Sequence, residues 1–154
     1  DVVFKRAKLR AMHLLEDMDR TEAGLREKLR QGLYPEDAAE EAVRYVKSFG
    51  YLDDTRYAEN FVRSRKGSKS RREIQALLLR KGISADKIEA AFEACYSEDE
   101  DGEEEAVRKI LKKKRFSTEN SDEAQIQKMY ACLARKGFRY DTIRQVIQNY
   151  HENA

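Results

Sequence analysis

Apolar residues recur along this chain at spacings of three and four, the period that places them on one face of an α-helix. Three stretches end alike, with a basic or polar residue, then glycine, then a large apolar residue. These endings are KLRQGL (28–33), LLRKGI (78–83) and LARKGF (133–138). Since glycine in the left-handed conformation commonly ends a helix, we expect Gly32, Gly82 and Gly137 to do so here. The apolar residue that follows each glycine can then fold back onto its helix.

The sequence on both sides of each glycine also repeats. An amphipathic helix with a polar start precedes it, and the expected N-caps are Thr21, Ser70 and Ser121, the last without a full capping box. A second helix follows it, with one apolar face. The positions on this face are Ala39, Val43 and Val46 in the first copy, Ile88, Phe92 and Cys95 in the second, and Ile143, Ile147 and Tyr150 in the third. The first copy needs one inserted residue, which we place at Tyr34–Pro35.

A third helix precedes each pair, roughly over residues 2–16, 53–65 and 103–114. Five extra residues of the third copy fit in the polar loop RFSTENS (115–121). The sequence therefore predicts an all-α protein of three tandem three-helix repeats, residues 1–50, 51–100 and 101–154, forming an elongated, curved array. No segment shows the alternation of a strand, and no β-hairpin is predicted.

The stretch SFGYLDDTRYAENF (48–61) is interpreted as a joint between two repeats. We expect Gly50 to end one helix, Leu52 to anchor the joint, and Asp53 to cap the next helix. Asp54 lies in the first helical turn, where a carboxylate meets the positive end of the helix dipole. Exposed side chains here would be second-line partner contacts, namely Tyr51, Asp54 and Arg56.

Charge is unevenly distributed, although the net formal charge is only +2. Residues 61–82 carry eight Lys or Arg and one acid, whereas residues 97–105 carry seven acids and no base. Residues 106–116 then carry six bases and no acid. Basic blocks of this kind indicate a polyanion or an acidic protein surface as partner.

Two basic runs are the candidate binding segments. The first, RSRKGSKSRR (63–72), places Arg71 and Arg72 at a helix start, where cations oppose the dipole, so stability alone does not explain them. The second, RKILKKKRF (108–116), is also consistent with a helix whose charges suit its own dipole. The partner- or DNA-binding candidates are Arg63, Arg65, Lys66, Lys69, Arg71, Arg72, Lys112, Lys113, Lys114 and Arg115.

Catalytic chemistry has no candidate in this sequence. His13 and His151 are isolated, and neither a phosphate-cradling glycine loop nor a nucleophile motif occurs. Cys95 and Cys132 are interpreted as core residues in a reducing cytosol, and the acidic run 98–105 as a solvated loop. We expect no catalytic residue, metal site, cofactor, small-molecule substrate or membrane span, and a monomer in the cytoplasm. Because the chain begins with Asp1, we also expect a preceding segment.

The order of these motifs resembles the RecX family of bacterial regulatory proteins. The residues that carry the resemblance are 25–33, GYLDD with the following Tyr-Ala and Phe (50–61), the basic segment leading to 71–83, and 133–146. The resemblance implies tandem three-helix repeats and binding to the RecA recombinase, both free and as its filament on single-stranded DNA. It further implies inhibition of filament growth, ATP hydrolysis and strand exchange, contacts with DNA, and a role in DNA repair and the SOS response.

Two other functions remain open on the residues alone. A helix-turn-helix DNA-binding regulator would need an exposed helix with base-reading side chains, and TIRQVIQNY (142–150) offers Arg144, Gln145, Gln148 and Asn149. A passive helical scaffold would need no binding segment at all.

Overall fold

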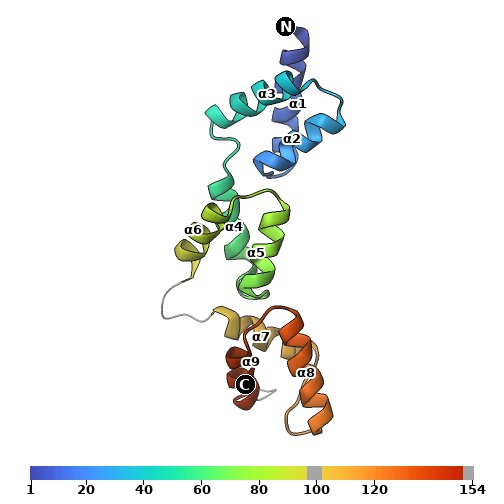
Figure 1. Ribbon diagram of the computed structural model, residues 1–154, viewed down its shortest axis with the longest axis vertical. Coiled ribbons are helices and arrows are strands. Elements are labelled where there is room, and N and C mark those ends of the chain that lie inside the picture. Colours follow the sequence, from blue (N-terminus) through green and yellow to red (C-terminus); the bar gives the residue numbers. More distant parts are fainter. Residues whose placement is uncertain (97–101, 151–154) are drawn as a thin grey trace. The chain divides into compact units, whose positions relative to one another are not determined.

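A computed structural model gives the fold of this chain and describes residues 1–96 and 102–150. This part of the chain contains nine α-helices and no strand (Figure 1). The helices are α1 (Val2–Asp17), α2 (Glu22–Gln31), α3 (Glu36–Ser48), α4 (Asp54–Arg65), α5 (Arg71–Arg80), α6 (Ala85–Cys95), α7 (Gly102–Lys113), α8 (Glu123–Arg135) and α9 (Tyr140–Gln148). The predicted all-α class, with three helices per repeat, is confirmed.

Packing divides the chain into two compact units. The first comprises residues 1–60 and 78–91, and the second comprises residues 61–77 and 92–154. The division passes through the middle repeat, α4 to α6, so the hydrogen bonds of the first junction described below lie within the first unit and those of the second junction within the second.

The first unit is centred on small and branched side chains of α1, α2 and α3. Ala7 and Ala11 of α1 are fully buried, as are Leu25 and Leu29 of α2. The apolar positions 39, 43 and 46 of α3 are buried with them. Alanine on α1 allows α3 to pack closely against it, and long apolar side chains of α2 fill the remaining space.

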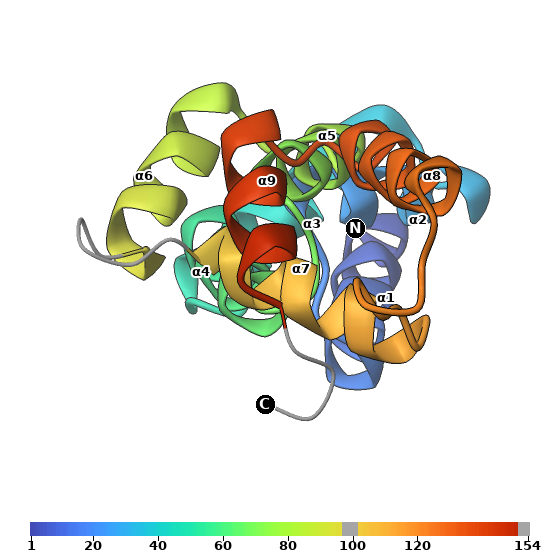
Figure 2. The same ribbon diagram turned by 90° about the horizontal axis from the view of Figure 1, so that it is seen from below.

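In the second unit α7 and α9 pack together, and α8 contacts α9 (Figures 1 and 2). The core that they share is formed by Leu111, Leu133 and Ile143, all fully buried, with Phe116 and Phe138 beside them. The predicted apolar face of the last helix, Ile143, Ile147 and Tyr150, is buried here.

Five helices end with the same backbone arrangement. The second residue after each of these helices has a positive φ, and the residue that follows it donates its N–H to the carbonyl five residues earlier, at 3.0–3.2 Å. The residues with positive φ are Leu33, Gly50, Gly82, Arg115 and Gly137, with φ of 64°, 75°, 84°, 54° and 97°. This hydrogen bond satisfies a carbonyl that the helix itself leaves unpaired.

Our expectation for Gly32 is wrong. Gly32 has φ −79°, and the left-handed residue of the first repeat is Leu33, because Tyr34 rather than Leu33 donates its N–H back to Leu29. Leu33 is 90% exposed and does not fold back onto its helix. In this register Leu33 and Gly82 are 49 residues apart, as are Thr21 and Ser70, so the insertion at Tyr34–Pro35 is wrong as well.

Replacing Leu33 with glycine is expected to stabilise the protein by about 0.5–1 kcal/mol. A side chain in the left-handed region costs roughly 1–2 kcal/mol, and the greater freedom of glycine in the unfolded chain offsets part of the gain. Urea denaturation followed by circular dichroism measures the change. Leu33→Ala keeps the Cβ atom and serves as control, so an equal gain in both variants would contradict the role of backbone strain.

The first junction between repeats is formed at the start of α2. The Thr21 hydroxyl accepts the Gly24 N–H at 3.0 Å, as an N-cap, and donates to the carbonyl of Lys81 at 2.7 Å. The Glu22 N–H donates to Asp54 Oδ1 at 2.8 Å. Two backbone donors of the α2 N-terminus are thus satisfied, one of them by a carboxylate from the following repeat.

The second junction repeats this arrangement at the start of α5. The Ser70 hydroxyl accepts the Glu73 N–H at 3.1 Å and donates to the carbonyl of Lys136 at 2.6 Å. The Arg71 N–H donates to Glu103 Oε1 at 3.3 Å. Thr21 and Ser70 are therefore N-caps as predicted, and both also carry a contact between repeats, which the sequence did not indicate.

Glycine at the end of α5 and α8 permits these junctions. A Cβ atom on Gly82 would lie 2.4 Å from the Cβ atom of Ala23. A Cβ atom on Gly137 would lie 2.8 Å from the Ser70 hydroxyl oxygen and 2.9 Å from the Cβ atom of Arg72. These glycines are thus required both by their positive φ and by the close approach of a helix from the preceding repeat.

The start of α8 differs from the other two. Asp122, not Ser121, is its N-cap, and it forms a full capping box with Gln125, so the prediction for Ser121 is wrong. Ser121 instead donates its hydroxyl to the carbonyl of Ser117 in the preceding turn. The capping box satisfies donors of the α8 N-terminus within the third repeat itself.

Candidate partner-binding surfaces

The basic segment, residues 63–72, spans the end of α4, a turn, and the start of α5. Three of its cations are held by contacts within the second unit. The Arg65 guanidinium lies 4.0 Å from the ring centre of Phe61, and the Lys66 ammonium donates to the carbonyl of Cys95 at 2.9 Å. Arg71 lies over the ring of Tyr96 at 4.2 Å.

These contacts give Lys66 and Arg71 a structural role. Lys66 places a positive charge at the C-terminal end of α6, where the helix dipole favours a cation. Arg71 stands at the start of α5 against the dipole, but its stacking on Tyr96 and the nearby carboxylate of Glu103 offset that cost.

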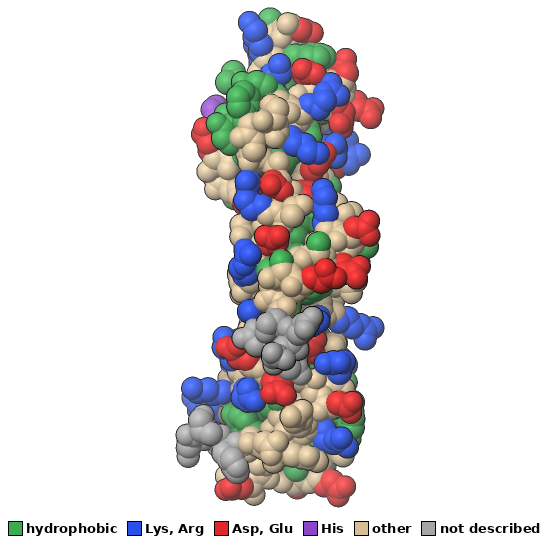
Figure 3. Space-filling view, turned by 90° about the vertical axis from the view of Figure 1, so that its left-hand side faces the viewer, with side chains coloured by type: hydrophobic (Ala, Val, Ile, Leu, Met, Phe, Trp, Pro, Cys, Tyr) green, Lys and Arg blue, Asp and Glu red, His purple; other side chains and the backbone are tan. Residues whose placement is uncertain are grey.

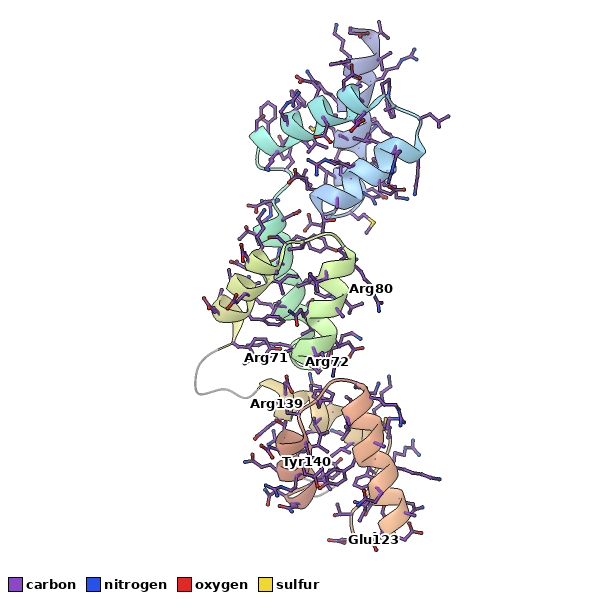
Figure 4. The ribbon with its side chains drawn as sticks, in the orientation of Figure 1. Arg71, Arg72, Arg80, Glu123, Arg139 and Tyr140 are labelled. Atoms are coloured by element: carbon purple, nitrogen blue, oxygen red, sulfur yellow. The ribbon has the colours of Figure 1, made fainter. Side chains whose placement is uncertain are left out.

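The remaining cations of the basic segment differ in exposure. Lys69 lies 3.4 Å from the carboxylate of Glu73, one helical turn away. Arg63 and Arg72 are exposed, and Figure 4 labels Arg71 and Arg72 at the start of α5. Arg72 stands against the dipole of α5, so helix stability does not account for it, and the exposed Arg63 and Arg72 are the cations of the segment best placed to meet a partner.

The second basic run is divided by the end of α7. Lys112 and Lys113 belong to the last helical turn, where they suit the dipole, whereas Lys114 and Arg115 follow the helix. Lys114 and Arg115 line a hollow together with Lys128 of α8. The sequence did not identify Lys128 as part of a basic surface.

An exposed aromatic cluster occurs in the first unit, formed by Tyr45, Phe49 and Tyr51. Their exposed fractions are 37%, 56% and 48%. The ring centres of Tyr45 and Phe49 are 5.0 Å apart, edge to face, and those of Phe49 and Tyr51 are 5.8 Å apart, stacked. Hydrophobic side chains gather over the region of α1 and α3 in the upper part of Figure 3. Exposed aromatic groups of this kind are typical of protein interfaces.

The cations beside the aromatic cluster are already paired. Lys8 lies 4.9 Å from the ring centre of Tyr45 and 3.8 Å from a Glu41 oxygen, and Arg44 donates to Glu41 at 2.7 Å. The hydrogen bond from Arg44, and then the charges of Arg44 and Lys8, lower the pKa of the Glu41 carboxyl. Both of these cations therefore share one carboxylate partner, Glu41.

A hollow of about 550 Å³ adjoins the aromatic cluster. Its apolar lining comes from Met12 and Leu15 of α1, and the acids Glu16 and Asp19 contribute to its wall. Tyr51 and Arg56 also line it, so two of the second-line candidates come together here. Arg56 donates to the carbonyl of Gly50 at 3.0 Å.

The third second-line candidate, Asp54, lies elsewhere, because its carboxylate accepts the Glu22 N–H in the first junction. Asp53 accepts the Arg56 N–H at 3.1 Å, as an N-cap does, and Leu52 is buried. These positions hold the first junction and the start of α4. Sequence reasoning missed Tyr45 and Phe49 because neither belongs to the buried face of α3. Their spacing of four, with Tyr45 in α3 and Phe49 directly after its last residue, was the available signal.

The histidines, the cysteines and the acidic side chains of the described residues do not come together in one site. In residues 1–96 and 102–150 no group of three or more His, Cys, Asp or Glu side chains could hold a metal ion, and no helix is long and apolar enough to span a bilayer. His13 is exposed, whereas His151 and residues 98–101 of the acidic run lie outside the described residues. Cys95 is buried, but Cys132 is half-buried and lines the hollow of Lys128, so its assignment to the core is wrong.

Comparisons with known proteins give a consistent result. Family models of the first, second and third three-helix domains of RecX match residues 7–45, 53–91 and 102–147. Regulatory protein RecX of Clostridium perfringens (strain SM101 / Type A) is 32% identical, with 97% of this chain and 71% of the relative covered. Regulatory protein RecX of Trichlorobacter lovleyi is 33% identical, with 91% of this chain and 92% of the relative covered. The crystal structure of RecX from Lactobacillus salivarius matches with a TM-score of 0.79 at 26% identity, covering 95% of each chain.

Proposed function

The chain belongs to the RecX family, and on that premise we propose that it is a non-enzymatic regulator of the RecA recombinase. It binds RecA and the RecA filament on single-stranded DNA in the cytoplasm. By occupying their surfaces it hinders filament growth, ATP hydrolysis and strand exchange, and so regulates DNA repair and recombination.

The observation that most supports a protein partner is the aromatic cluster of Tyr45, Phe49 and Tyr51. Large exposed aromatic groups supply much of the binding energy at protein interfaces, because burying them removes a large apolar area from water. The adjoining hollow combines apolar groups with Glu16 and Asp19, which suits an apolar side chain next to a Lys or Arg. The two acids of the lining outnumber its one base, Arg56, which disfavours the phosphates of a nucleic acid at this surface.

The basic segment supplies a second contact of opposite character. Arg63 and Arg72 are exposed beside cations that are held by Phe61, Tyr96 and the α6 C-terminus. An exposed basic surface speeds the encounter with an acidic protein surface or a phosphate backbone. The two surfaces together would bind a partner that presents both apolar and acidic groups.

ATP hydrolysis by preformed RecA filaments on single-stranded DNA tests this function. We expect the rate of ATP hydrolysis to fall and the filaments to shorten as this protein is added. An unchanged rate at a saturating concentration of the protein would overturn the proposal. Arg63→Glu with Arg72→Glu should raise the concentration for half-inhibition about tenfold, since charged contacts that steer association are lost. Arg6→Glu with Arg10→Glu makes the same charge change on exposed positions of α1 and should leave inhibition intact.

A DNA-binding regulator is the second candidate, favoured by the exposed side of α9. Arg144, Gln145 and Gln148 are exposed there, and Asn149 donates its side-chain amide to the carbonyl of Gln145. Affinity for bare DNA that equals or exceeds affinity for RecA-coated DNA would favour this candidate. If the chain binds neither, a passive scaffold remains.

A further inference from the structure

A basic hollow of about 520 Å³ lies between the end of α7 and the side of α8, in the second unit. Lys114 and Arg115 line it from the turn after α7, and Lys128 lines it from α8. Among residues 1–96 and 102–150, no aspartate or glutamate belongs to its lining. A concave surface with charges of one sign concentrates their field, so this hollow attracts anions more strongly than the same charges on a convex surface would.

The positive charge exceeds what helix stability requires. Cations after α7 suit its dipole, which accounts for Lys114 and Arg115. Lys128 lies in the middle of α8, where the dipole gives it no role. None of these three side chains forms an ion pair within residues 1–96 and 102–150. Three cations that face one hollow repel each other, and a bound anion would relieve that repulsion.

Hydrogen-bond donors complete the lining. Ser117 accepts the Asn120 N–H at 3.4 Å through its hydroxyl oxygen, so its hydroxyl hydrogen remains to be donated. The carboxamide oxygen of Gln125 accepts the Asp122 N–H at 2.9 Å, which leaves the NH₂ group of Gln125 as its donor side. Cations combined with neutral donors are the groups that bind phosphate oxygens in proteins.

We propose that this hollow binds a phosphate group, carried either by a free nucleotide or by the backbone of a single-stranded nucleic acid. Met129 adds an apolar surface to the lining, against which a base can rest. The site lies outside the aromatic cluster and the basic segment, and it is independent of the proposed binding to RecA.

Cys132 provides a direct readout, because its half-buried thiol lines the basic hollow, while the other cysteine, Cys95, is buried. Alkylation of Cys132 by N-ethylmaleimide is measured by mass spectrometry on the whole chain, at physiological salt and without RecA. The probes are ATP, inorganic pyrophosphate and a short oligo(dT), each added separately. We expect at least one probe to slow the alkylation of Cys132 about tenfold at saturation, since occupancy excludes the reagent.

Charge variants decide whether the hollow itself is responsible. Lys128→Glu should weaken protection about tenfold, whereas Lys87→Glu makes the same charge change in α6, outside the lining, and should preserve protection. Protection by ATP or pyrophosphate alone identifies a free nucleotide or phosphate, and protection by oligo(dT) alone identifies a nucleic-acid backbone. The proposal is overturned if no probe protects Cys132, or if both variants weaken protection equally.

Discussion

Replacing Gly82 with alanine is expected to lower the free energy of unfolding by about 3 kcal/mol. A side chain at φ +84° costs roughly 1–2 kcal/mol, because Cβ approaches the following carbonyl oxygen. The new Cβ atom would also lie 2.4 Å from the Cβ atom of Ala23, and overpacking of this kind costs about 1–3 kcal/mol. Urea denaturation followed by circular dichroism measures the loss.

Gly50 provides the matched control. Its φ is +75°, but a Cβ atom there would have no atom within 4 Å, so Gly50→Ala should cost only about 1 kcal/mol, from the backbone alone. The difference between the two variants isolates the contact between α2 and the end of α5. Equal losses in both variants would mean that Gly82 is required only for its backbone conformation, and that the first junction tolerates a methyl group.

The helices and their repetition could be predicted from the sequence because apolar spacing and helix-end glycines are local signals. The register of the first repeat could not be predicted in this way. The end of α2 has the same hydrogen bond as the other helix ends, here from the Tyr34 N–H to the Leu29 carbonyl. This bond places Leu33 rather than Gly32 at the left-handed position. A Cβ atom is sterically excluded at this position only where another repeat approaches, as at Gly82, whereas Leu33 is 90% exposed.

The location of the basic segment could be predicted from the sequence, but the role of each of its cations could not. Counting charges identified the segment, but the contacts of its members are made by residues distant in the chain. Lys66 reaches the carbonyl of Cys95, 29 residues away, and Arg71 stacks on Tyr96. Asp54, 32 residues from Glu22, is likewise used in a junction. Tertiary contacts therefore separate structural charges from those that can meet a partner.

Replacing both Phe49 and Tyr51 with alanine is expected to weaken binding to the RecA filament by about 30-fold or more. An aromatic side chain at the centre of an interface contributes roughly 2 kcal/mol or more, and these two rings stack on each other at 5.8 Å. Both are about half exposed, so the variant should retain its helices. Fluorescence anisotropy with labelled chain and preformed filaments measures the affinity, and circular dichroism checks the fold.

Tyr140→Ala is the control for this double variant. Tyr140, at the start of α9 (Figure 4), is 62% exposed, and its ring centre lies 5.5 Å from that of Tyr130. It therefore matches the aromatic cluster in chemistry but belongs to the second unit. Its replacement should change the affinity by less than about threefold, as for most exposed residues outside an interface centre. If Tyr140→Ala weakens binding as much as the double variant does, apolar exposure in general governs binding. Unchanged affinity of the Phe49 and Tyr51 variant would exclude the aromatic cluster from the interface, and the basic segment would then have to supply the specificity.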